Sequence, residues 1–531
     1  MHNILITDDI GPAGLALLEA ATDVHYNVVK LPAPDQLARL IGNYEGLITR
    51  SGTPLTAEIF EAARKLRVAG RAGVGLDNVD IDAATLRGVL VMNTPEANTL
   101  AAVELTMALL LAVCRHLPQA NASVKRGEWT RAKFLGTQLS AKTLGVIGLG
   151  RIGSRVATRC QAFGAKVIAY DPYITEEVAE RLHVHLVSEL DELLAQADII
   201  TVHTPLTEET KGMIGACEIA KMKDRVYLIN CARGGIYAEP ALYEALVSGK
   251  VAGAGIDVYS SEPPKTELLT KLLALENVVA APHIGANTAE AQRDVAVQIV
   301  QQVIDALRGY NFRNVVNLPF ADGVDYRSLA PYMTLAEKLG SLQMQLIHGR
   351  IDRLEVEFRG EEVEAHVKPL TVALLKGLLA PVLSDAVNYV NAPRLAEERG
   401  ISVSHTRHPA AEDYSNVILC RAHSNKETRL VGGALFLHTQ SRIVLLDEFR
   451  IDALPHGPAL ILANRDVPGV IGRVGTLLGT HGINIAEWQM GRSGPGGEAV
   501  SYINIDTPVG EAALRELRAL STILDVRQVI L

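Results

Sequence analysis

The stretch that decides the fold is Thr143-Leu-Gly-Val-Ile-Gly148-Leu-Gly150-Arg-Ile-Gly153. Its short apolar run, Leu144 to Ile147, predicts a buried strand. A G-x-G-x-x-G turn follows at once, and a helical pattern continues from Ile152 to about Ala162. A strand, a glycine-rich turn and a helix in this order indicate a βαβ unit that binds a dinucleotide.

Each glycine in this turn has a physical reason. Gly148 allows the tight turn, Gly150 lets a pyrophosphate approach the backbone, and Gly153 lets the helix pack close to the strand. The first turn of the helix then offers free N–H groups and a partial positive charge to phosphates. A G-x-G-x-x-G alone is weak evidence, because glycine-rich turns are common.

A second predicted strand, Lys166–Tyr170, strengthens the interpretation. It ends at Asp171, roughly 20 residues after the glycines, where the dinucleotide fingerprint requires an acid. A carboxylate there can accept hydrogen bonds from both ribose hydroxyls and would repel a 2′-phosphate, so the sequence predicts NAD as the cofactor. The alternative is that Asp171 only caps a helix after an ordinary βα turn.

Composition limits the function classes. The 531 residues predict about three or four domains. The chain is 48% hydrophobic and 21% charged, and its net charge of −9 argues against a nucleic-acid partner. The longest apolar run, Leu105–Val113, is too short to cross a bilayer, and the N-terminus has no signal-peptide pattern. We therefore expect a cytoplasmic protein with no membrane partner.

The cysteines support the same interpretation. They are scattered, odd in number and without a C-x-x-C pair: Cys114, Cys160, Cys217, Cys231 and Cys420. This pattern fits reduced thiols in the cytosol and predicts neither a disulfide framework nor a metal site.

Strands and helices alternate through the first 317 residues. Residues 1 to about 95 predict strands at 4–7, 46–49 and 66–69 with helices at 13–20 and 57–63. After a long apolar helix at 101–117, the dinucleotide unit continues with strands at 199–202, 226–230, 253–258 and 278–281. Its helices are predicted at 189–195, 215–221, 240–248 and 289–308. This alternation predicts doubly wound parallel sheets that bind ligands at the carboxyl ends of their strands.

The pattern changes after Asn317. Helices at 329–340 and 369–379 and strands at 353–358, 416–421 and 432–437 predict an α+β domain, and 452–458 is predicted as a linker. The last segment predicts strand 459–463, helix 470–480, strands 483–490 and 499–506, helix 511–519 and strand 523–530. That βαββαβ order is ferredoxin-like.

Three polar residues downstream of the cofactor turn, each near a strand end, suggest catalysis. Oxidation of an alcohol to a ketone needs a base for the hydroxyl proton and a cofactor for the hydride, and histidine as a residue type titrates near neutral pH. His283 suits the base, Glu262 could orient its ring, and Arg233 offers a planar fork for a carboxylate. Individually they could be a turn residue, a cap and a surface ion pair.

The motifs resemble the D-isomer-specific 2-hydroxyacid dehydrogenases, in particular the long members of that family. The matching stretches are Arg71-Ala-Gly-Val-Gly-Leu-Asp-Asn-Val-Asp80, Val91-Met-Asn-Thr-Pro95, Leu149-Gly-Arg-Ile-Gly153, Asn230-Cys-Ala-Arg-Gly-Gly235, Gly255-Ile-Asp-Val258 and Pro282-His-Ile-Gly-Ala286. The remainder resembles the family's intervening domain and a C-terminal ACT regulatory domain.

The resemblance implies a fold and its domains. Two Rossmann-like or flavodoxin-like parallel-sheet domains would precede an α+β intervening domain and a ferredoxin-like ACT domain. The implied substrate-binding domain is discontinuous, 1–96 with 284–318, around an NAD-binding domain at 97–283. The intervening domain, of the type that binds substrate allosterically, would span 319–455 and the ACT domain 459–531.

The resemblance also implies roles for individual residues. The catalytic set would be the acid/base His283, its partner Glu262 and the carboxylate anchor Arg233. NAD contacts would come from Gly148, Gly150, Arg151, Ile152, Gly153, Asp171, Thr204, Cys231, Arg233, Asp257, His283 and Ala286. The substrate would meet Arg50, Gly73, Val74, Gly75 and Asn98, and Arg131 would reach its phosphate, from the same or a neighbouring subunit.

The implied reaction is the NAD-dependent oxidation of D-3-phosphoglycerate to 3-phosphohydroxypyruvate, the first committed step of L-serine biosynthesis, in a homo-oligomer (dimer or tetramer). One alternative is a glyoxylate or hydroxypyruvate reductase, which normally lacks the long tail. Another is an NAD-sensing binding protein, against which the complete Arg, Glu and His set argues.

The ACT resemblance implies an amino-acid effector, L-serine. Asn464 and Asp466 stand in a turn that leads from a strand into a helix, whose free N–H groups could bind a carboxylate while Asp466 holds an ammonium group. Asn484 brings an amide to the start of the next strand. The alternative is a dimerisation module that binds nothing.

Overall fold

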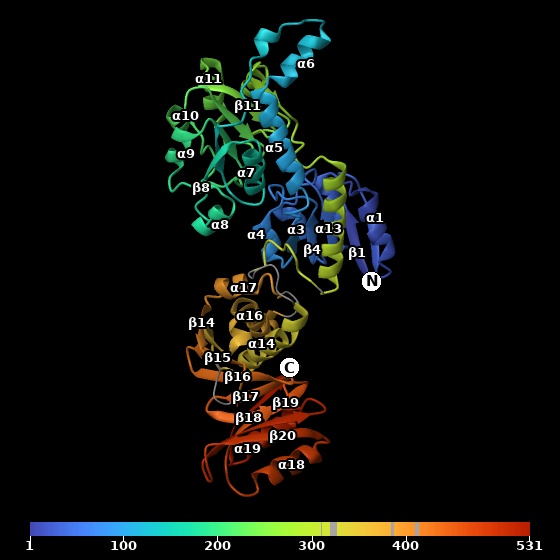
Figure 1. Cartoon of the computed structure of the whole chain (residues 1–531). Helices are drawn as coiled ribbons and strands as arrows, with labels where there is room; N and C mark the ends of the chain where they lie inside the picture. The colour runs from blue at the N-terminus through green and yellow to red at the C-terminus, as the bar shows by residue number, and fades with distance from the viewer. Residues whose placement is uncertain (310, 319–325, 384–386, 409–413) are drawn as a thin grey trace.

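The computed structural model describes residues 1–309, 311–318, 326–383, 387–408 and 414–531, and four sheets run through these ranges (Figure 1). The predicted start of the third domain, residue 319, lies outside them. The two sheets of the N-terminal half are stacked above those of the C-terminal half in this view, which gives the chain an elongated shape.

The first sheet is parallel and has the order β2-β1-β3-β4-β5, which is the flavodoxin-like arrangement. Its elements are β1 (His2–Ile6), α1 (Gly11–Ala20), β2 (Val24–Val28), α2 (Pro34–Ile41), β3 (Gly46–Thr49), α3 (Ala57–Ala62), β4 (Val68–Arg71), α4 (Ile81–Leu86) and β5 (Leu90–Met92). The later helix α13 (Ala289–Leu307) returns to this sheet, and its buried face packs on β3, β4 and α1.

The second sheet is also parallel and has the order β12-β11-β10-β9-β6-β7-β8. The strand order reverses between β6 and β9, and in such sheets ligands bind at that point. Its elements are α5 (Thr99–Cys114), α6 (Leu117–Lys125), the 3-10 helix η1 (Arg131–Phe134), β6 (Thr143–Ile147), α7 (Gly153–Ala162), β7 (Lys166–Tyr170), α8 (Glu176–Arg181), β8 (His185–Leu186), α9 (Leu190–Gln196), β9 (Ile199–Val202), α10 (Ala216–Lys221), β10 (Val226–Asn230), α11 (Glu239–Ser248), β11 (Val251–Ile256), α12 (Glu267–Leu273) and β12 (Val278–Ala280).

Helix α5 connects the two sheets and is buried along most of its length against β10, β11 and β12. Among the described helices, none is by itself long and apolar enough to cross a membrane. The pair α5 and α6 passes that test together, but a bend of 64° separates the two helices.

The third sheet has six strands in the order β14-β13-β15-β16-β17-β18, and helices α14 and α16 pack against each other over its apolar core. Its elements are α14 (Tyr326–Leu346), β13 (Ile351–Arg359), α15 (Glu361–Glu364), α16 (Val367–Leu383), α17 (Ala392–Glu398), β14 (Ser402–His408), β15 (Val417–Ser424), β16 (Thr428–Phe436), β17 (Gln440–Leu446) and β18 (Phe449–Ala453).

The fourth sheet is antiparallel in the order β20-β21-β19-β22, as a ferredoxin-like βαββαβ unit requires. Its elements are β19 (Pro458–Arg465), α18 (Val470–Thr480), β20 (Ile485–Arg492), β21 (Glu498–Ile505), α19 (Glu511–Ala519) and β22 (Ile523–Ile530). The predicted fold class, two parallel-sheet domains followed by an α+β and a ferredoxin-like domain, is therefore confirmed.

The predicted long helix at 101–117 is wrong at its C-terminal end. Helix α5 stops at Cys114, His116 takes a left-handed φ of +50°, and α6 starts at Leu117 with Pro118 in its first turn. Proline is well tolerated there because the first N–H groups of a helix have no partner within it. The sequence prediction also missed β2, an edge strand whose side chains are mostly exposed.

Candidate active site

A cleft with a volume of about 320 Å³ lies where α5 joins the two parallel sheets. Its walls come from the segments after β4, β6, β9, β10, β11 and β12 and from the start of α5. Of the residues predicted from the sequence, those that line the cleft are Val74, Asn98, Arg151, Ile152, Thr204, Cys231, Arg233, Asp257, His283 and Ala286. The lining residues that were not predicted are Pro95, Thr99, Ala102, His203, Pro205, Ala232 and Gly285.

The predicted acid/base pair is formed in this cleft. Nδ1 of His283 lies 2.7 Å from Oε2 of Glu262, and the other carboxylate oxygen accepts the N–H of Tyr259 at 3.1 Å. The His283 side chain is 49% exposed and takes a left-handed φ of +52°, which is uncommon for residues other than glycine. Glu262 thereby fixes the ring, with Nδ1 towards the carboxylate and Nε2 available to a bound molecule.

Asp257 holds the loop that carries the histidine. Its buried carboxylate accepts the N–H groups of Ile284 and Gly285 at 2.8 and 2.9 Å, and its carbonyl accepts the N–H of His283 at 2.9 Å. Burial raises the pKa of Asp257, and the two N–H groups work in the opposite direction. The rigid loop therefore fixes the backbone of His283.

Arg233 lies against the glycine-rich segment after β4. A Cβ added to Gly75 would come within 2.6 Å of the Arg233 guanidinium, so the missing side chain makes room for it. Nε of Arg233 is 3.6 Å from a carboxylate oxygen of Asp77, and Nη1 donates to the carbonyl of Ala232 at 2.8 Å.

A second arginine, Arg71, meets the same segment from the end of β4. A Cβ added to Gly73, whose φ is +140°, would overlap the Arg71 guanidinium. Burial lowers the pKa of Arg71, and the nearby charge of Arg233 lowers it further. Its Nε is buried without a hydrogen-bond partner among the described residues. The two guanidinium groups create a positive field suited to an anionic substrate.

Arg50 follows β3 on the same sheet edge. Its backbone N–H donates to Asp8 at 3.0 Å, and its guanidinium donates to Gln292. Burial lowers the pKa of Arg50, whereas Asp8 and Asp9 raise it, and the Arg50 charge also contributes to the lowered pKa of Arg71. Arg50 therefore adds to the positive field but is not itself among the cleft-lining residues.

The glycine-rich turn fits a dinucleotide. Gly148 has a φ of +89°, and a Cβ on Gly153 would overlap the Gly148 carbonyl oxygen, so helix α7 approaches the turn as closely as the fingerprint requires. A Cβ on Gly150 would meet no atom of the described chain within 4 Å, so a ligand has access to its backbone. Oγ1 of Thr204 and Oδ1 of Asn98 are buried in the cleft wall without described partners, which suits a polar ligand.

Asp171 closes the turn from the end of β7. Its Oδ2 accepts the N–H of Leu149 at 2.8 Å, and its Oδ1 accepts the N–H of Tyr173 at 2.9 Å. Each oxygen keeps a further lone pair that can accept from a ribose hydroxyl. These residues fit the adenosine half of NAD.

Arg131 does not join the cleft of its own chain. It lies on η1, beyond α6, in a projecting arm at the top of Figure 1. The arm, residues 117–135, exposes four large apolar side chains: Leu117, Val124, Trp129 and Leu135.

The predicted effector residues are only partly brought together. Asn464 and Asp466 line a cavity of about 520 Å³ with Arg492 and the start of α18. Nη1 of Arg492 is 3.4 Å from Oδ2 of Asp466. Asn484 lies at the other end of β20 from Arg492, where its amide donates to Asp506 at 2.8 Å.

The cleft residues contain no reactive thiol. Burial raises the pKa of Cys231 to about 12, so its thiol stays protonated. Within the described ranges, no three His, Cys, Asp or Glu side chains form a group that could hold a metal ion.

The sequence interpretation gave Arg71 no role, although it quoted the motif that begins there. The available signal was its position: it ends a strand of a parallel sheet, two residues before a glycine in a glycine-rich turn. Ligands in such sheets bind at the carboxyl ends of the strands, so a cation at this point is a candidate for anion binding.

Comparison with known families identifies three regions of the chain. Residues 107–285 match the NAD binding domain of D-isomer specific 2-hydroxyacid dehydrogenases, 328–447 the D-3-phosphoglycerate dehydrogenase intervening domain, and 459–522 the ACT domain.

Among curated proteins, the chain is 43% identical over 526 residues to a D-3-phosphoglycerate dehydrogenase of Methanocaldococcus jannaschii, with 99% of each chain covered. It is 41% identical over 530 residues to that of Bacillus subtilis, again with 99% of each covered. Among solved structures, D-lactate dehydrogenase from Aquifex aeolicus, complexed with NAD and lactic acid, is 32% identical with a TM-score of 0.53. The match covers 58% of this chain and 96% of that one.

Proposed function

The chain belongs to the D-3-phosphoglycerate dehydrogenase family, and we propose on that basis that it oxidises D-3-phosphoglycerate to 3-phosphohydroxypyruvate with NAD. The observation that carries the proposal is the 2.7 Å contact between His283 and Glu262 in a cleft that also contains Arg233. This reaction begins the phosphorylated route to L-serine.

NAD would be held by the glycine-rich turn at residues 148–153 and by Asp171, and when bound it would supply the hydride acceptor for C2 of the substrate. Nε2 of His283 accepts the proton of the C2 hydroxyl, and the Glu262 carboxylate on Nδ1 stabilises the imidazolium that forms. The Asp257 contacts keep the ring at the mouth of the cleft. In the reverse direction, the same imidazolium returns the proton to the oxygen.

Arg233 binds the substrate carboxylate through its planar fork, which orients C2 beside His283. Arg71, from the facing sheet, adds a second cation to the same anionic region. The substrate phosphate needs a further positive group, and Arg50 and Arg131 are the candidates. Arg131 would act on the cleft of a second copy.

A homodimer would supply that second copy. The arm formed by residues 117–135 exposes Leu117, Val124, Trp129 and Leu135, the last two at 79% and 88%. Exposed apolar side chains on a projecting segment are typical of an interaction surface, and a two-fold axis would make each arm cover its partner.

The cysteines in the described structure are all free thiols, which supports a cytoplasmic location.

The arginines give a test of substrate identity. Replacing Arg50 or Arg131 with Ala should lower kcat/KM for D-3-phosphoglycerate by about 10- to 100-fold, while D-glycerate, which lacks the phosphate, changes little. Steady-state NADH formation with both substrates measures this. Lys125→Ala, on the same arm, is the matched control and should leave both rates unchanged. An equal loss with both substrates would contradict phosphate binding by the replaced arginine.

Cofactor choice is the next prediction. Asp171→Ala should lower the NAD to NADP ratio of kcat/KM by about tenfold or more, because both the ribose hydrogen bonds and the repulsion of the 2′-phosphate are lost. The same residue also accepts two backbone N–H groups, so Asp171→Asn, which keeps an acceptor oxygen, serves as control for local structure. Equal use of NAD and NADP by the unaltered protein would contradict the assignment.

We also propose that the C-terminal domain binds L-serine. Asp466 would hold the ammonium group, and Arg492 with the N–H groups at the start of α18 would hold the carboxylate. Because Asn484 is at the other end of β20, it would contribute from the paired ACT domain of a second copy. ACT domains that bind amino acids do so at an interface between paired domains.

Calorimetry of the full chain tests serine binding. L-Serine should bind at millimolar concentration or below, and Asp466→Ala and Asn484→Ala should each weaken binding by about tenfold, which corresponds to about 1.4 kcal/mol. Glu511→Gln, at the start of α19, should bind as the wild type does. Absence of binding to the unaltered protein at millimolar serine would leave the dimerisation role alone.

A further inference from the structure

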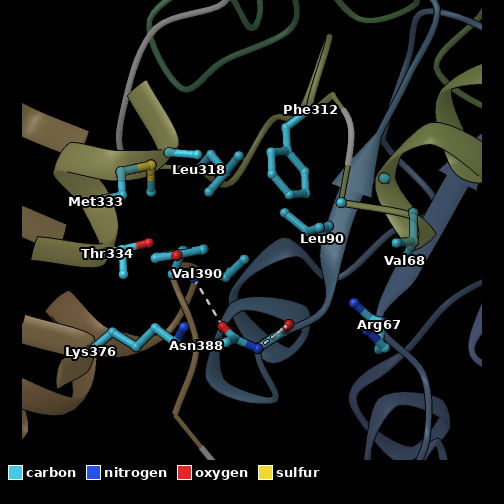
Figure 2. A pocket seen from close by; sticks show the side chains of 15 residues that line it. Arg67, Val68, Leu90, Phe312, Leu318, Met333, Thr334, Lys376, Asn388 and Val390 are labelled. Atoms are coloured by element: carbon cyan, nitrogen blue, oxygen red, sulfur yellow. Dashed lines mark hydrogen bonds between the residues drawn. The ribbon is translucent and has the colours of Figure 1, made fainter. Parts of the chain in front are cut away.

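A second cavity, of about 370 Å³, lies between the first sheet and the intervening domain (Figure 2). One wall comes from β4, β5 and the end of α13, and the other from α14, α16 and the turn at 388–390. It shares no lining residue with the catalytic cleft or with the cavity beside α18. No role described above uses this cavity.

Most of its surface is apolar. Figure 2 shows Val68, Leu90 and Phe312 on one side of a common space, and Leu318, Met333 and Val390 on the other. On α14, Ala330 and Thr334 lie one turn apart, and both are exposed although the flanking Leu329 and Leu335 are buried. This face of α14 is therefore open to the cavity and can pack against an apolar body about the size of a substituted benzene ring.

Two cations from opposite walls also reach the cavity. The Lys376 ammonium lies 2.9 Å from Glu337 and 4.4 Å from the centre of the Tyr389 ring, and the Tyr389 hydroxyl donates to Glu337. This cluster fixes the ammonium. On the other wall, Arg67 donates to the carbonyl of Leu307 at 3.4 Å, and no carboxylate lies within ion-pair distance of it in the described structure.

The two walls are joined by Asn388. Its Nδ2 donates to the carbonyl of Gly88 at 2.7 Å, and its Oδ1 accepts the N–H of Val390 at 2.9 Å. A side chain on Gly88, where φ is +71°, would overlap the Asn388 amide. This contact holds the cavity together across the junction, so the space is defined before any ligand enters. Preformed apolar pockets with a few convergent polar groups are the usual form of small-molecule sites.

We propose that this cavity binds a small organic anion: an apolar, ring-sized body with one carboxylate. The body would pack on Leu90, Phe312 and Met333, and the carboxylate would bind the Arg67 guanidinium, while the Lys376 ammonium on the opposite wall adds to the positive charge of the cavity. A ligand that contacts both walls would stabilise the arrangement in which the first sheet and the intervening domain are packed together.

The probe is 4-(trifluoromethyl)benzoate, and its affinity for the full chain is measured by fluorine NMR. NADH and D-3-phosphoglycerate, which cannot react with each other, are present to occupy the catalytic cleft. The neutral analogue 4-(trifluoromethyl)benzamide has the same body and should bind at least about fivefold more weakly, because it lacks the charge-assisted contact.

Two substitutions locate the site. Ala330→Trp fills the cavity from an exposed position and should weaken probe binding by tenfold or more, whereas Val247→Trp, at an exposed position of α11, should not. Arg67→Gln should remove most of the preference for the benzoate over the benzamide, whereas Arg64→Gln, an exposed arginine outside the cavity, should keep it. Unchanged melting temperatures verify folding.

Benzoate binding to Ala330→Trp with wild-type affinity, or an Arg67→Gln variant that keeps the full preference for the anion, would overturn the proposal. The inference does not rest on the proposed reaction. If the dehydrogenase assay failed, the effect of Ala330→Trp on probe binding would still test the cavity. If the probe did not bind, the roles proposed for the catalytic residues would not be affected.

Discussion

His283→Ala should lower kcat by about 10²- to 10⁴-fold, the usual contribution of a positioned general acid/base. In the wild type, Glu262 orients the His283 ring through a contact of 2.7 Å, and the ring accepts the proton of the substrate hydroxyl. Without the imidazole, that proton has no acceptor. NAD binding should change little, because the turn at residues 148–153 and Asp171 are made by other segments. Single-turnover NADH formation gives the rate, and calorimetry gives the NAD affinity.

Glu262→Gln distinguishes an effect on the ring from an effect on the fold. The Glu262 carboxylate accepts the Tyr259 N–H at 3.1 Å, and the amide oxygen of glutamine can still do so. The amide cannot stabilise an imidazolium as a carboxylate does. We expect a smaller loss in kcat than for His283→Ala and a changed pH profile. An His283→Ala variant with wild-type turnover would remove His283 from the proton step.

Arg233→Ala should lower kcat/KM for D-3-phosphoglycerate by about 10²- to 10³-fold, because loss of one partner of a buried, hydrogen-bonded charge pair costs about 2 to 5 kcal/mol. The effect should fall on substrates with a carboxylate beside the hydroxyl, since the guanidinium fork matches that group. Kinetic constants for both directions of the reaction measure it.

Arg233→Lys is the control that separates charge from geometry. Lysine keeps the positive charge but cannot make two parallel hydrogen bonds, so activity should remain well below that of the wild type. The Asp77 carboxylate lies 3.6 Å from Arg233, and the Asp77 side chain is 68% exposed. Asp77→Asn should therefore have only a small effect on the kinetic constants. Wild-type constants for Arg233→Ala would show that the carboxylate binds elsewhere.

The parts of the fold with a strong local pattern were predictable. Strands β7, β9 and β10 have the predicted bounds because buried strands form continuous apolar runs, and α18 and α19 have them because these helices have one apolar face. Strand β22 also has the predicted bounds, although apolar and polar residues are mixed along it. Edge strand β2 was missed because it is only five residues long and none of its side chains is fully buried, although apolar and polar residues alternate along it.

The candidate site was predictable where residues stand at strand ends. His283, Glu262 and Arg233 follow different strands, and a parallel sheet brings those ends to one edge. Contacts between sheets were not predictable in this way. Nothing local indicates that Arg71 faces Arg233 across the glycines at 73 and 75, or that Arg131 lies on an arm away from its own cleft. These relations depend on how separate domains pack, which no short sequence pattern records.

The most direct test of the central claim is a comparison of 2-oxo acids as substrates for reduction by NADH, with the full chain and equal enzyme concentration. The account predicts that kcat/KM for 3-phosphohydroxypyruvate exceeds the values for hydroxypyruvate and glyoxylate by about 10²-fold or more, because a site built to bind a phosphate discriminates strongly against molecules that lack it. A kcat/KM for glyoxylate or hydroxypyruvate equal to or above that for the phosphorylated substrate would contradict it.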